Sequence, residues 1–202
     1  MKLFITGIGT EIGKTVCSAI LTKYFNAEYW KPVQSGDLGF SDTMKVKKWV
    51  GKNTVCHAET YCFQLAASPH QSAKEEGITI DLNKIKLPET KNNLIVEGAG
   101  GLMVPINDSE FIIDLIEELN LPTALVVKNY LGCINHTLLS IMLLNQRKIT
   151  LQYLILNGDF PSDTERIICK NISSETKIIR IPEIENITKE NIESITKQLE
   201  KI

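Results

Sequence analysis

The sequence predicts an α/β fold of three layers, in which a mostly parallel central sheet is flanked by helices on both faces. Short apolar runs recur along the chain, and LIVE (94–97), TALVV (123–127) and YLILN (153–157) show no alternation of apolar and polar residues. Continuous apolar runs are typical of strands that are buried on both faces. Helical patterns separate these runs, and strands that alternate with helices favour a parallel sheet.

The same two patterns give each element in turn. Strands are expected over residues 3–6, 29–31, 94–97, 123–127, 153–157 and 178–181. Helices are expected over residues 14–24, 41–50, 111–119, 135–146, 161–169 and 188–202. The helix over 111–119 has one apolar face, made of Phe111, Ile112, Leu115, Ile116 and Leu119. The closing helix has an apolar stripe made of Ile192, Ile195, Leu199 and Ile202.

The composition predicts one soluble domain over residues 1–202. Hydrophobic residues make up 43% of the chain and charged residues 23%, which suits a single sizeable core. The formal net charge is -2 and the 22 lysines and arginines are spread along the chain, so a small-molecule substrate is expected rather than a nucleic acid. Apolar runs fall short of the roughly 18 residues that cross a bilayer, so a cytoplasmic protein without a membrane partner is expected.

Cysteine usage points to free thiols. The chain has five cysteines, an odd number, and none of them forms a CxxC pair. This pattern disfavours a disulfide framework or a zinc site, and buried, unpaired thiols are expected instead.

Polar residues and glycines follow the predicted strands at the point where each strand ends. Ligands of open parallel sheets collect at the carboxyl ends of the strands, so these residues mark the expected site. The strand ends are Thr6-Gly7, Lys31-Pro32, Glu97-Gly98, Val127-Lys128 and Asn157-Gly158.

The first strand leads into FITGIGTEIGKT, a glycine-containing loop that ends in Gly13-Lys14-Thr15. A strand, a loop of convergent backbone N–H groups and a helix N-terminus together form a cradle for phosphate. In such a loop Lys14 reaches the terminal phosphates and the Thr15 hydroxyl is placed for Mg²⁺. The loop is one residue longer than a Walker A loop, because Ile8 stands where the first glycine is expected and Gly7 precedes it.

Two other interpretations of this loop are weaker. A dinucleotide fingerprint would place its third glycine at Ile12 and would not end in Gly-Lys-Thr. A turn without a ligand is disfavoured because Lys14, in the first helical turn, would oppose the helix macrodipole unless an anion compensated it. The sequence therefore predicts a fold similar to that of the P-loop NTPases.

Further motifs in the same order resemble the ATP-dependent dethiobiotin synthetases. Besides TGIGTEIGKT (6–15), the matching segments are KPVQSG (31–36), SDT (41–43), SPHQSA (68–73), VEGAGGLMVPI (96–106), LGCINHT (131–137) and LILNG (154–158). The resemblance implies a reaction in biotin synthesis, in which 7,8-diaminononanoate, CO₂ and ATP give dethiobiotin, ADP and phosphate. It implies a carbamate, then a carbamic-phosphoric anhydride, then closure of the ureido ring. It also implies a Mg²⁺ cofactor and a homodimer with its active site near the interface.

The chemistry of such a reaction requires cations. A carbamate and a γ-phosphate about 4 Å apart repel one another by roughly 4 kcal/mol at an effective dielectric near 20. Lys14 and Lys31 are the expected catalytic cations, and the resemblance assigns Lys31 to the reacting centre. Ser35 resembles the serine that contacts the substrate.

Mg²⁺ prefers oxygen ligands, and the expected ligands are Thr15, Asp42 and Glu97. Glu97 ends a strand predicted to be buried, where an unpaired carboxylate would be costly and a metal would compensate it. Asp42 has a second interpretation, as a residue favoured at the start of a helix that Ser41 caps. Asp37 is a nearby alternative ligand.

The resemblance also implies the nucleotide-binding residues. Gly98 to Gly101 form a small-residue loop whose amides can approach phosphates, Asn157 resembles the residue that reads adenine, and the segment 182–184 resembles a second base-contacting loop in a divergent region. The full expected set is Glu11, Ile12, Gly13, Lys14, Thr15, Val16, Asp42, Glu97, Gly98, Ala99, Gly100, Asn157, Gly158, Pro182, Glu183 and Ile184.

The segment LGCINHT follows a strand and opens a helix, so its backbone N–H groups can receive an anion. The resemblance implies that Cys133, Ile134 and Asn135 bind the substrate's tail carboxylate across a dimer interface. In the alternative interpretation, Asn135 is an N-cap and Cys133 is a packing residue. Two histidines, His70 and His136, receive no role.

Two other functions fit the sequence less well than a dethiobiotin synthetase does. A switch ATPase of the partitioning or septum-positioning type would carry a lysine near the start of the loop, where this chain has Gly-Ile-Gly at 7–9. Such proteins also often end in a basic amphipathic helix, whereas residues 188–202 mix acidic and basic side chains. An amidotransferase-type cobalamin synthetase would need a glutaminase domain that 202 residues cannot hold.

Overall fold

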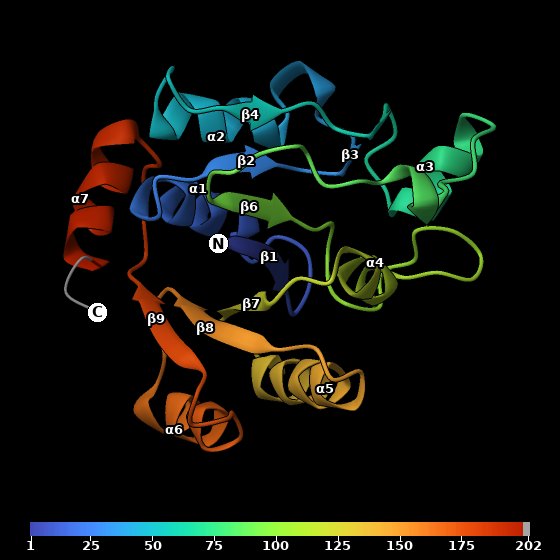
Figure 1. The fold of residues 1–202 in the computed structure, drawn as a ribbon. Helices are drawn as coiled ribbons and strands as arrows, with labels where there is room; N and C mark the ends of the chain where they lie inside the picture. Colours follow the sequence, from blue (N-terminus) through green and yellow to red (C-terminus); the bar gives the residue numbers. More distant parts are fainter. Residues whose placement is uncertain (200–202) are drawn as a thin grey trace.

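A seven-stranded sheet forms the centre of the molecule, in the strand order β4-β2-β6-β1-β7-β8-β9 (Figure 1). The computed structural model describes residues 1–199. All neighbouring strands of this sheet are parallel. The strands are β1 (Lys2–Gly7), β2 (Glu28–Trp30), β4 (Cys56–His57), β6 (Leu94–Glu97), β7 (Thr123–Lys128), β8 (Leu151–Asn157) and β9 (Lys177–Ile181). A second, two-stranded parallel sheet pairs β3 (Val33–Ser35) with β5 (Tyr61–Phe63).

Helices cover both faces of the sheet, as Figure 1 shows. One face packs against α1 (Lys14–Tyr24), α2 (Asp42–Val50) and α7 (Lys189–Leu199). The other face packs against α4 (Ile112–Leu119), α5 (Cys133–Gln146) and α6 (Ser162–Lys170). A short helix, α3 (Pro69–Glu75), lies beside β3 and β5, and 3₁₀ turns form at Leu38–Phe40 and Leu82–Lys84.

Successive residues of each central strand enter different cores. In β1, Leu3 and Ile5 pack toward α1 and α7, whereas Phe4 packs toward α4. In β6, Ile95 and Val96 divide in the same way. Side chains alternate across a strand, so a strand with helices on both sides is apolar at every position. The predicted three-layer α/β fold is confirmed, and with it the reason why these runs lack alternation.

Six strands occur where the sequence predicts them, and residues 94–97 agree to the residue. The strands β3, β4 and β5 and the helix α3 were not predicted. Each of these strands has only two or three residues, which is too short to show a period.

The start of α5 was placed wrongly. The sequence suggested a helix from Asn135, with Asn135 as a possible N-cap, but the helix begins at Cys133 and Gly132 occupies the N-cap. Gly132 has a φ of 104°, which favours glycine, so a backbone turn rather than a polar side chain starts this helix.

Two other helices differ less from their predicted bounds. Phe111 stands in the N-cap position of α4 instead of inside it, and its N–H donates to Asp114 Oδ2 at 2.7 Å. The rest of the predicted apolar face of α4 is buried. The stripe predicted for the closing helix is buried at Ile192, Ile195 and Leu199, while Ile202 lies outside the described residues.

All five cysteines are free thiols, but only some are buried. Cys17 and Cys133 are buried, Cys56 and Cys169 are half-buried, and Cys62 is exposed, so the prediction of buried thiols is wrong for Cys62. Within residues 1–199, every helix is too short or too polar to span a membrane.

Candidate active site

A cavity of about 780 Å³ lies at the carboxyl ends of the strands, where the sequence predicts the site. Its walls come from the loop after β1, the ends of β2, β3 and β6, the start of α2 and the segment before α3. The members of this wall that carry charge include Glu11, Lys14, Lys31, Asp42 and Glu97. A second cavity, of about 1000 Å³, lies near the C-terminal ends of α1 and α2, whose last turns carry Lys23 and Lys48. Lysines at that end of a helix are accounted for by the helix macrodipole.

The loop after β1 is shaped by packing at both of its ends. Gly13 has a φ of 86°, and a Cβ on it would lie 2.3 Å from Asn157 Nδ2. That same amide nitrogen donates to the Ile12 carbonyl at 2.8 Å, so β8 fixes the loop where it enters α1. At the other end, a Cβ on Gly7 would lie 2.2 Å from Ile12 Cδ1. Gly7 therefore makes room for the buried Ile12, which explains a glycine one residue before the Walker position.

The helix that follows the loop presents its N-terminus to the cavity. α1 begins at Lys14, its first turn contains no acidic side chain, and no side chain caps it. Its unpaired backbone N–H groups and positive dipole end suit an anion. Lys14 Nζ donates to the Gly9 carbonyl at 2.6 Å, so the ammonium group lies across the loop. Of the predicted residues 11–16, all but Ile12 line the cavity, and the Ile12 side chain is buried in the core.

A buried charge cluster stands beside this loop. Lys31 Nζ lies 2.7 Å from Asp42 Oδ2 and 3.1 Å from Glu97 Oε1. Thr15 Oγ1 donates to the same Glu97 Oε1 at 2.8 Å. Lys31 is 6% exposed and Glu97 is 1% exposed. Residues from β6, α1, α2 and the end of β2 therefore meet, as the sequence predicts for Thr15, Lys31, Asp42 and Glu97.

One member of this cluster is not predicted by the sequence. Tyr29, which is fully buried in β2, donates its hydroxyl to Glu97 Oε2 at 2.9 Å. The sequence contained a partial signal, because a carboxylate at the end of a buried strand requires hydrogen-bond donors. It did not contain the register of β2 against β6, which places the two side chains together.

The pKa values of Lys31 and Asp42 are both shifted in the direction that favours the charged form. Burial alone would lower the pKa of Lys31, but Glu97 and Asp42 outweigh burial and raise it above its usual value. Burial would raise the pKa of Asp42, but Lys31 and then Lys45 outweigh burial and lower it. Lys45 Nζ lies 3.0 Å from Asp42 Oδ1. Lys14 behaves differently, because burial lowers its pKa to about 8 in spite of the opposing effect of Glu97.

The donor set of the cluster fits Mg²⁺. The Thr15 hydroxyl and the Glu97 carboxylate share a hydrogen bond, and Lys31 bridges Glu97 to Asp42, so three oxygen ligands line one cavity. Mg²⁺ is usually held by one or two carboxylates together with waters and phosphates. No group of three or more His, Cys, Asp or Glu side chains suited to a metal occurs within residues 1–199, so a dedicated all-protein cage is absent there.

The two interpretations of Asp42 coincide in the structure. Ser41 caps α2 by accepting from Met44 N, and Asp42 is the first residue of that helix. The Asp42 side chain also binds Lys31, so its place at the helix start is what positions it in the cluster. The side chain of Asp37, the alternative ligand, also lines the cavity, but it is 71% exposed and its ion pair is with Lys45, at 3.5 Å.

Ser35 lines the cavity with an unused hydroxyl. Its Oγ is buried and has no hydrogen-bond partner within residues 1–199. Buried hydroxyls normally have a partner, so this oxygen lacks the hydrogen bond that its burial would normally require.

The loop after β6 packs closely on the phosphate loop. A Cβ on Gly98 would lie 2.7 Å from the Phe4 ring, and a Cβ on Gly101 would lie 3.1 Å from the Gly7 carbonyl. Gly100 has a φ of 64°. Ala99 and Gly100 line the cavity. Close packing on Phe4 of β1 accounts for Gly98, and close packing on the phosphate loop accounts for Gly101; Gly98 itself does not line the cavity.

The residues predicted to contact the base gather on the other side of the loop. Asn157 binds the Ile12 carbonyl, and Gly158 has a φ of 90°. A Cβ on Gly158 would lie 2.5 Å from Glu183 Oε2, which places Gly158 against the segment Pro182, Glu183 and Ile184. Glu183 also lies 3.9 Å from Lys128 Nζ.

The residues predicted to bind the substrate tail lie apart. Cys133, Ile134 and Asn135 form the first turn of α5, and they do not line the 780 Å³ cavity. One turn further, His136 lines a smaller cavity of about 290 Å³, which also includes Gly7 to Thr10 and Gly101 to Val104. Tyr130 OH lies 2.7 Å from His136 Nδ1.

Comparison with known proteins shows which family the chain is similar to. A family model described as an AAA domain matches residues 1–191. The chain is 46% identical over 201 residues to the ATP-dependent dethiobiotin synthetase BioD of Christiangramia forsetii, with 97% of this chain and 96% of the relative covered. It is 44% identical to the ATP-dependent dethiobiotin synthetase BioD of Cytophaga hutchinsonii, covering 94% of this chain and 92% of the relative.

Solved structures of low sequence identity share the fold. A ParA family ATPase from Chlorobium tepidum has a TM-score of 0.54 at 15% identity, covering 98% of this chain and 90% of that chain. The Aquifex aeolicus MinC:MinD cell division complex contains a chain with a TM-score of 0.52 at 13% identity, covering 100% of this chain and 96% of that chain. These similarities place the chain in the same α/β fold and carry no further conclusion.

The fixed geometry of the loop predicts that two glycine-to-alanine changes differ in their effect on ADP affinity. Gly13→Ala should weaken ADP binding by about tenfold or more, because a Cβ there meets Asn157 and the left-handed backbone costs roughly 1–2 kcal/mol. Gly9→Ala is the matched control, since a Cβ on Gly9 meets no atom within 4 Å. Calorimetric titration with ADP and thermal melting measure both effects. Equal ADP affinity in the two variants would contradict this account of the loop.

The lowered pKa of Lys14 predicts a pH-dependent affinity. Around pH 8 to 9 part of the protein carries a neutral Lys14, while phosphate favours the charged form, so ADP binding should take up protons. ADP affinity should therefore fall as pH rises through about 8, and it should level off below about pH 7. Titration calorimetry in buffers of different ionisation enthalpy measures the uptake. Lys14→Arg, which stays charged, should show no uptake, and uptake equal to that of the natural chain would refute the assignment.

Proposed function

The chain belongs to the family of ATP-dependent dethiobiotin synthetases, and on that premise we propose how its site carries out the reaction. The substrates are 7,8-diaminononanoate, CO₂ and ATP, and the products are dethiobiotin, ADP and phosphate. The observation that supports this assignment best is the buried Lys31, which lies between Asp42 and Glu97 beside the phosphate loop.

The reaction divides into three steps. One amine of the diamine attacks CO₂ and loses a proton, which gives a carbamate. A carbamate oxygen then attacks the γ-phosphorus, and the bond from that phosphorus to the β,γ-bridging oxygen breaks to release ADP. The second amine finally attacks the carbonyl carbon of the resulting anhydride, loses a proton and expels phosphate, which closes the ureido ring.

Bringing the carbamate to the γ-phosphate is the step that needs the protein's charges. Both groups are anions, and their repulsion at about 4 Å is roughly 4 kcal/mol at an effective dielectric near 20. Lys31 supplies a cation that stays protonated at neutral pH, because its acidic neighbours raise its pKa. Lys14 supplies a second cation from the loop, and phosphate oxygens would raise its pKa from about 8. Lys31 and Lys14 are accordingly the proposed catalytic residues.

We propose that Thr15, Asp42 and Glu97 hold Mg²⁺. A bound Mg²⁺ would neutralise part of the triphosphate charge and polarise the γ-phosphoryl oxygens. The protein's own contribution is to orient both carboxylates, through the contacts of Lys31 with Asp42 and Glu97 and of Lys45 with Asp42.

The remaining predicted residues divide between the two substrates. The backbone of residues 11–16 and 98–100 is proposed to contact the phosphates, and Asn157, Gly158 and the segment 182–184 are proposed to contact the base. Ser35 Oγ, which is buried without a partner within residues 1–199, is proposed to bind the diamine. Residues 1–202 are proposed to act as one domain, and the cytoplasm, where ATP is available, is the proposed location.

We further propose that the protein is a homodimer formed through α5. Several large apolar side chains are exposed on this helix and on the loops beside it. Leu139 is 55% and Met142 is 66% exposed, one helical turn apart, and the exposed Leu131 and Met103 lie on neighbouring loops. An exposed apolar patch of this kind is typical of a protein interface. The first turn of α5, with the proposed carboxylate-binding residues Cys133, Ile134 and Asn135, would lie beside that interface.

The function predicts that ADP release depends on the diamine. Protein, Mg²⁺, bicarbonate and ATP should release ADP only when 7,8-diaminononanoate is added, and dethiobiotin should appear in equal amount. Lys31→Ala should lower this rate about 10²–10³-fold, because it removes a cation from the reacting anions. It should also cost roughly 3–5 kcal/mol of unfolding free energy, since the buried Glu97 and the half-buried Asp42 lose a partner.

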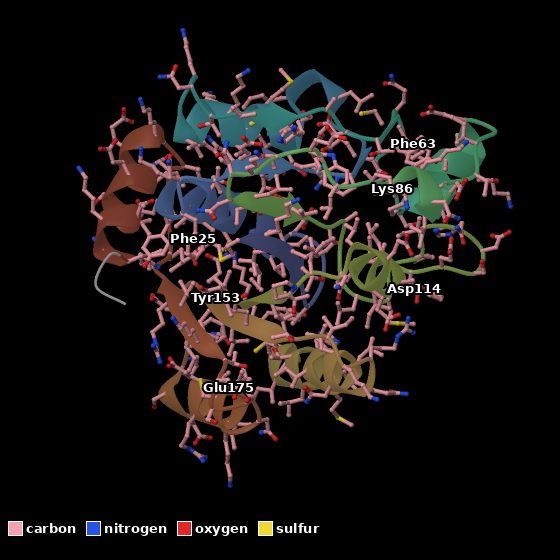
Figure 2. The ribbon with its side chains drawn as sticks, viewed as in Figure 1. Phe25, Phe63, Lys86, Asp114, Tyr153 and Glu175 are labelled. Atoms are coloured by element: carbon pink, nitrogen blue, oxygen red, sulfur yellow. The ribbon has the colours of Figure 1, made fainter. Side chains whose placement is uncertain are left out.

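The control for that assay is Lys86→Ala, because Lys86 (labelled in Figure 2) is an exposed lysine that lies 3.2 Å from Glu118. It should keep the natural rate and stability. Circular dichroism at the assay temperature establishes that the Lys31 variant is folded. ADP release without the diamine would overturn the function, and a fully active Lys31→Ala would overturn the assignment of the reacting centre.

The proposed interface predicts the effect of a charge placed on it. Leu139→Glu should convert a dimer of twice 22.6 kDa to a monomer of 22.6 kDa, because it buries a carboxylate in an apolar contact. Light scattering after gel filtration measures the mass. Val55→Glu is the control, since Val55 is 51% exposed but lies away from α5. A natural chain that is already monomeric, or a dimeric Leu139→Glu, would contradict the interface.

A further inference from the structure

Tyr29 spans the space between two strands to reach Glu97. In the parallel register of β2 and β6, Tyr29 stands opposite Ile95, and Glu97 is two residues further along β6. Residues two apart on a strand point to the same face, so Tyr29 and Glu97 are diagonal neighbours on one face of the sheet. A diagonal pair is within reach of an aromatic side chain, and the Tyr29 hydroxyl lies 2.9 Å from Glu97 Oε2.

The two oxygens of Glu97 therefore have different surroundings. Oε1 receives hydrogen bonds from Thr15 and Lys31, both of which line the 780 Å³ cavity. Oε2 receives its hydrogen bond from Tyr29, which belongs to the apolar core under α1 and α7 and does not line the cavity. The Glu97 carboxylate is thus held in one orientation, with Oε1 toward the cavity and Oε2 toward the core.

Tyr29 is the donor to this oxygen within residues 1–199, and its hydroxyl has Glu97 Oε2 as its one hydrogen-bond partner there. Without that hydroxyl, Oε2 would be a buried acceptor that lacks a donor, and the carboxylate would be free to turn.

We propose that Tyr29 is a positioning residue, which binds Glu97 Oε2 and thereby fixes Glu97 Oε1 as the oxygen offered to Mg²⁺. This inference rests on the proposed metal-binding role of Glu97. Hydrogen-bond partners that orient a metal ligand typically contribute 10–100-fold to metal affinity. Tyr29 would contribute in that way without touching the metal, the nucleotide or the diamine.

The test compares two tyrosine-to-phenylalanine changes in one core. Tyr29→Phe keeps the ring and removes the hydroxyl, and it should raise the Kd of Mg²⁺ for the protein saturated with ADP by about tenfold or more. Tyr153→Phe is the matched control. Tyr153 is 8% exposed in the same core, and its ring centroid lies 5.9 Å from that of Phe25 (both are labelled in Figure 2). It should leave the Mg²⁺ affinity unchanged.

Isothermal titration of Mg²⁺ into the ADP complex is the primary readout, and it does not require turnover. The rate of ADP formation should recover at saturating Mg²⁺, so the change appears in the Mg²⁺ requirement rather than in kcat. A structural defect would instead lower kcat at every Mg²⁺ concentration. If Tyr29→Phe does not fold, Tyr29→Met fills the same space without an oxygen and takes its place.

Glu97→Gln separates the failure of this inference from failure of the proposed metal site. If Glu97→Gln keeps the natural Mg²⁺ affinity, Glu97 is not a metal ligand and the proposed role of Tyr29 is refuted as well. If Glu97→Gln loses affinity but Tyr29→Phe does not, only the role of Tyr29 is overturned. If both lose affinity, Tyr29→Phe should have no further effect in the Glu97→Gln background, because the two residues act through one carboxylate.

Discussion

The burial of the Glu97 carboxylate is the constraint on which the rest of this site depends. A carboxylate that is 1% exposed at the end of a central strand is tolerated only when charge and hydrogen bonds compensate it. Thr15 provides part of that compensation from α1, and Tyr29 and Lys31 provide the rest from β2 and the residue that follows it. Because each of them must reach one carboxylate, the positions of β2 and α1 are tied to the end of β6.

The parallel sheet makes this convergence possible. Strands β1, β2 and β6 are neighbours and run in the same direction, so the segments that follow them emerge at one edge. Packing then sets the distances between these segments. Gly7 admits Ile12, Gly98 admits Phe4 and Gly13 admits the Asn157 amide, so each loop is held by a contact with another element. Glycine serves this site chiefly by allowing close approach of loops, in addition to any contact with phosphate.

The sequence predicts those features of the fold and the site that depend on a few neighbouring residues. The doubly buried strands, the phosphate loop and the need of Glu97 for a partner all follow from a few neighbouring residues. Tyr29 could not be predicted in this way, because its role depends on which residue of β6 lies opposite it. The strands β3 to β5 carry too few residues to show a period. At α5, a polar residue near the start of the helix suggested Asn135 as a cap, but a left-handed turn at Gly132 starts the helix earlier.

The charges of the cluster connect its stability to its chemistry. Lys31 contacts both the buried Glu97 and the half-buried Asp42, whereas Lys45 contacts Asp42 alone, so Lys31 is the cation that joins the two carboxylates. Lys31 also lines the cavity, so the side chain that pairs with these carboxylates in the fold is the one proposed to serve the reaction. Its acidic neighbours raise its pKa, and the same contacts therefore favour the cation in the fold and in the proposed chemistry.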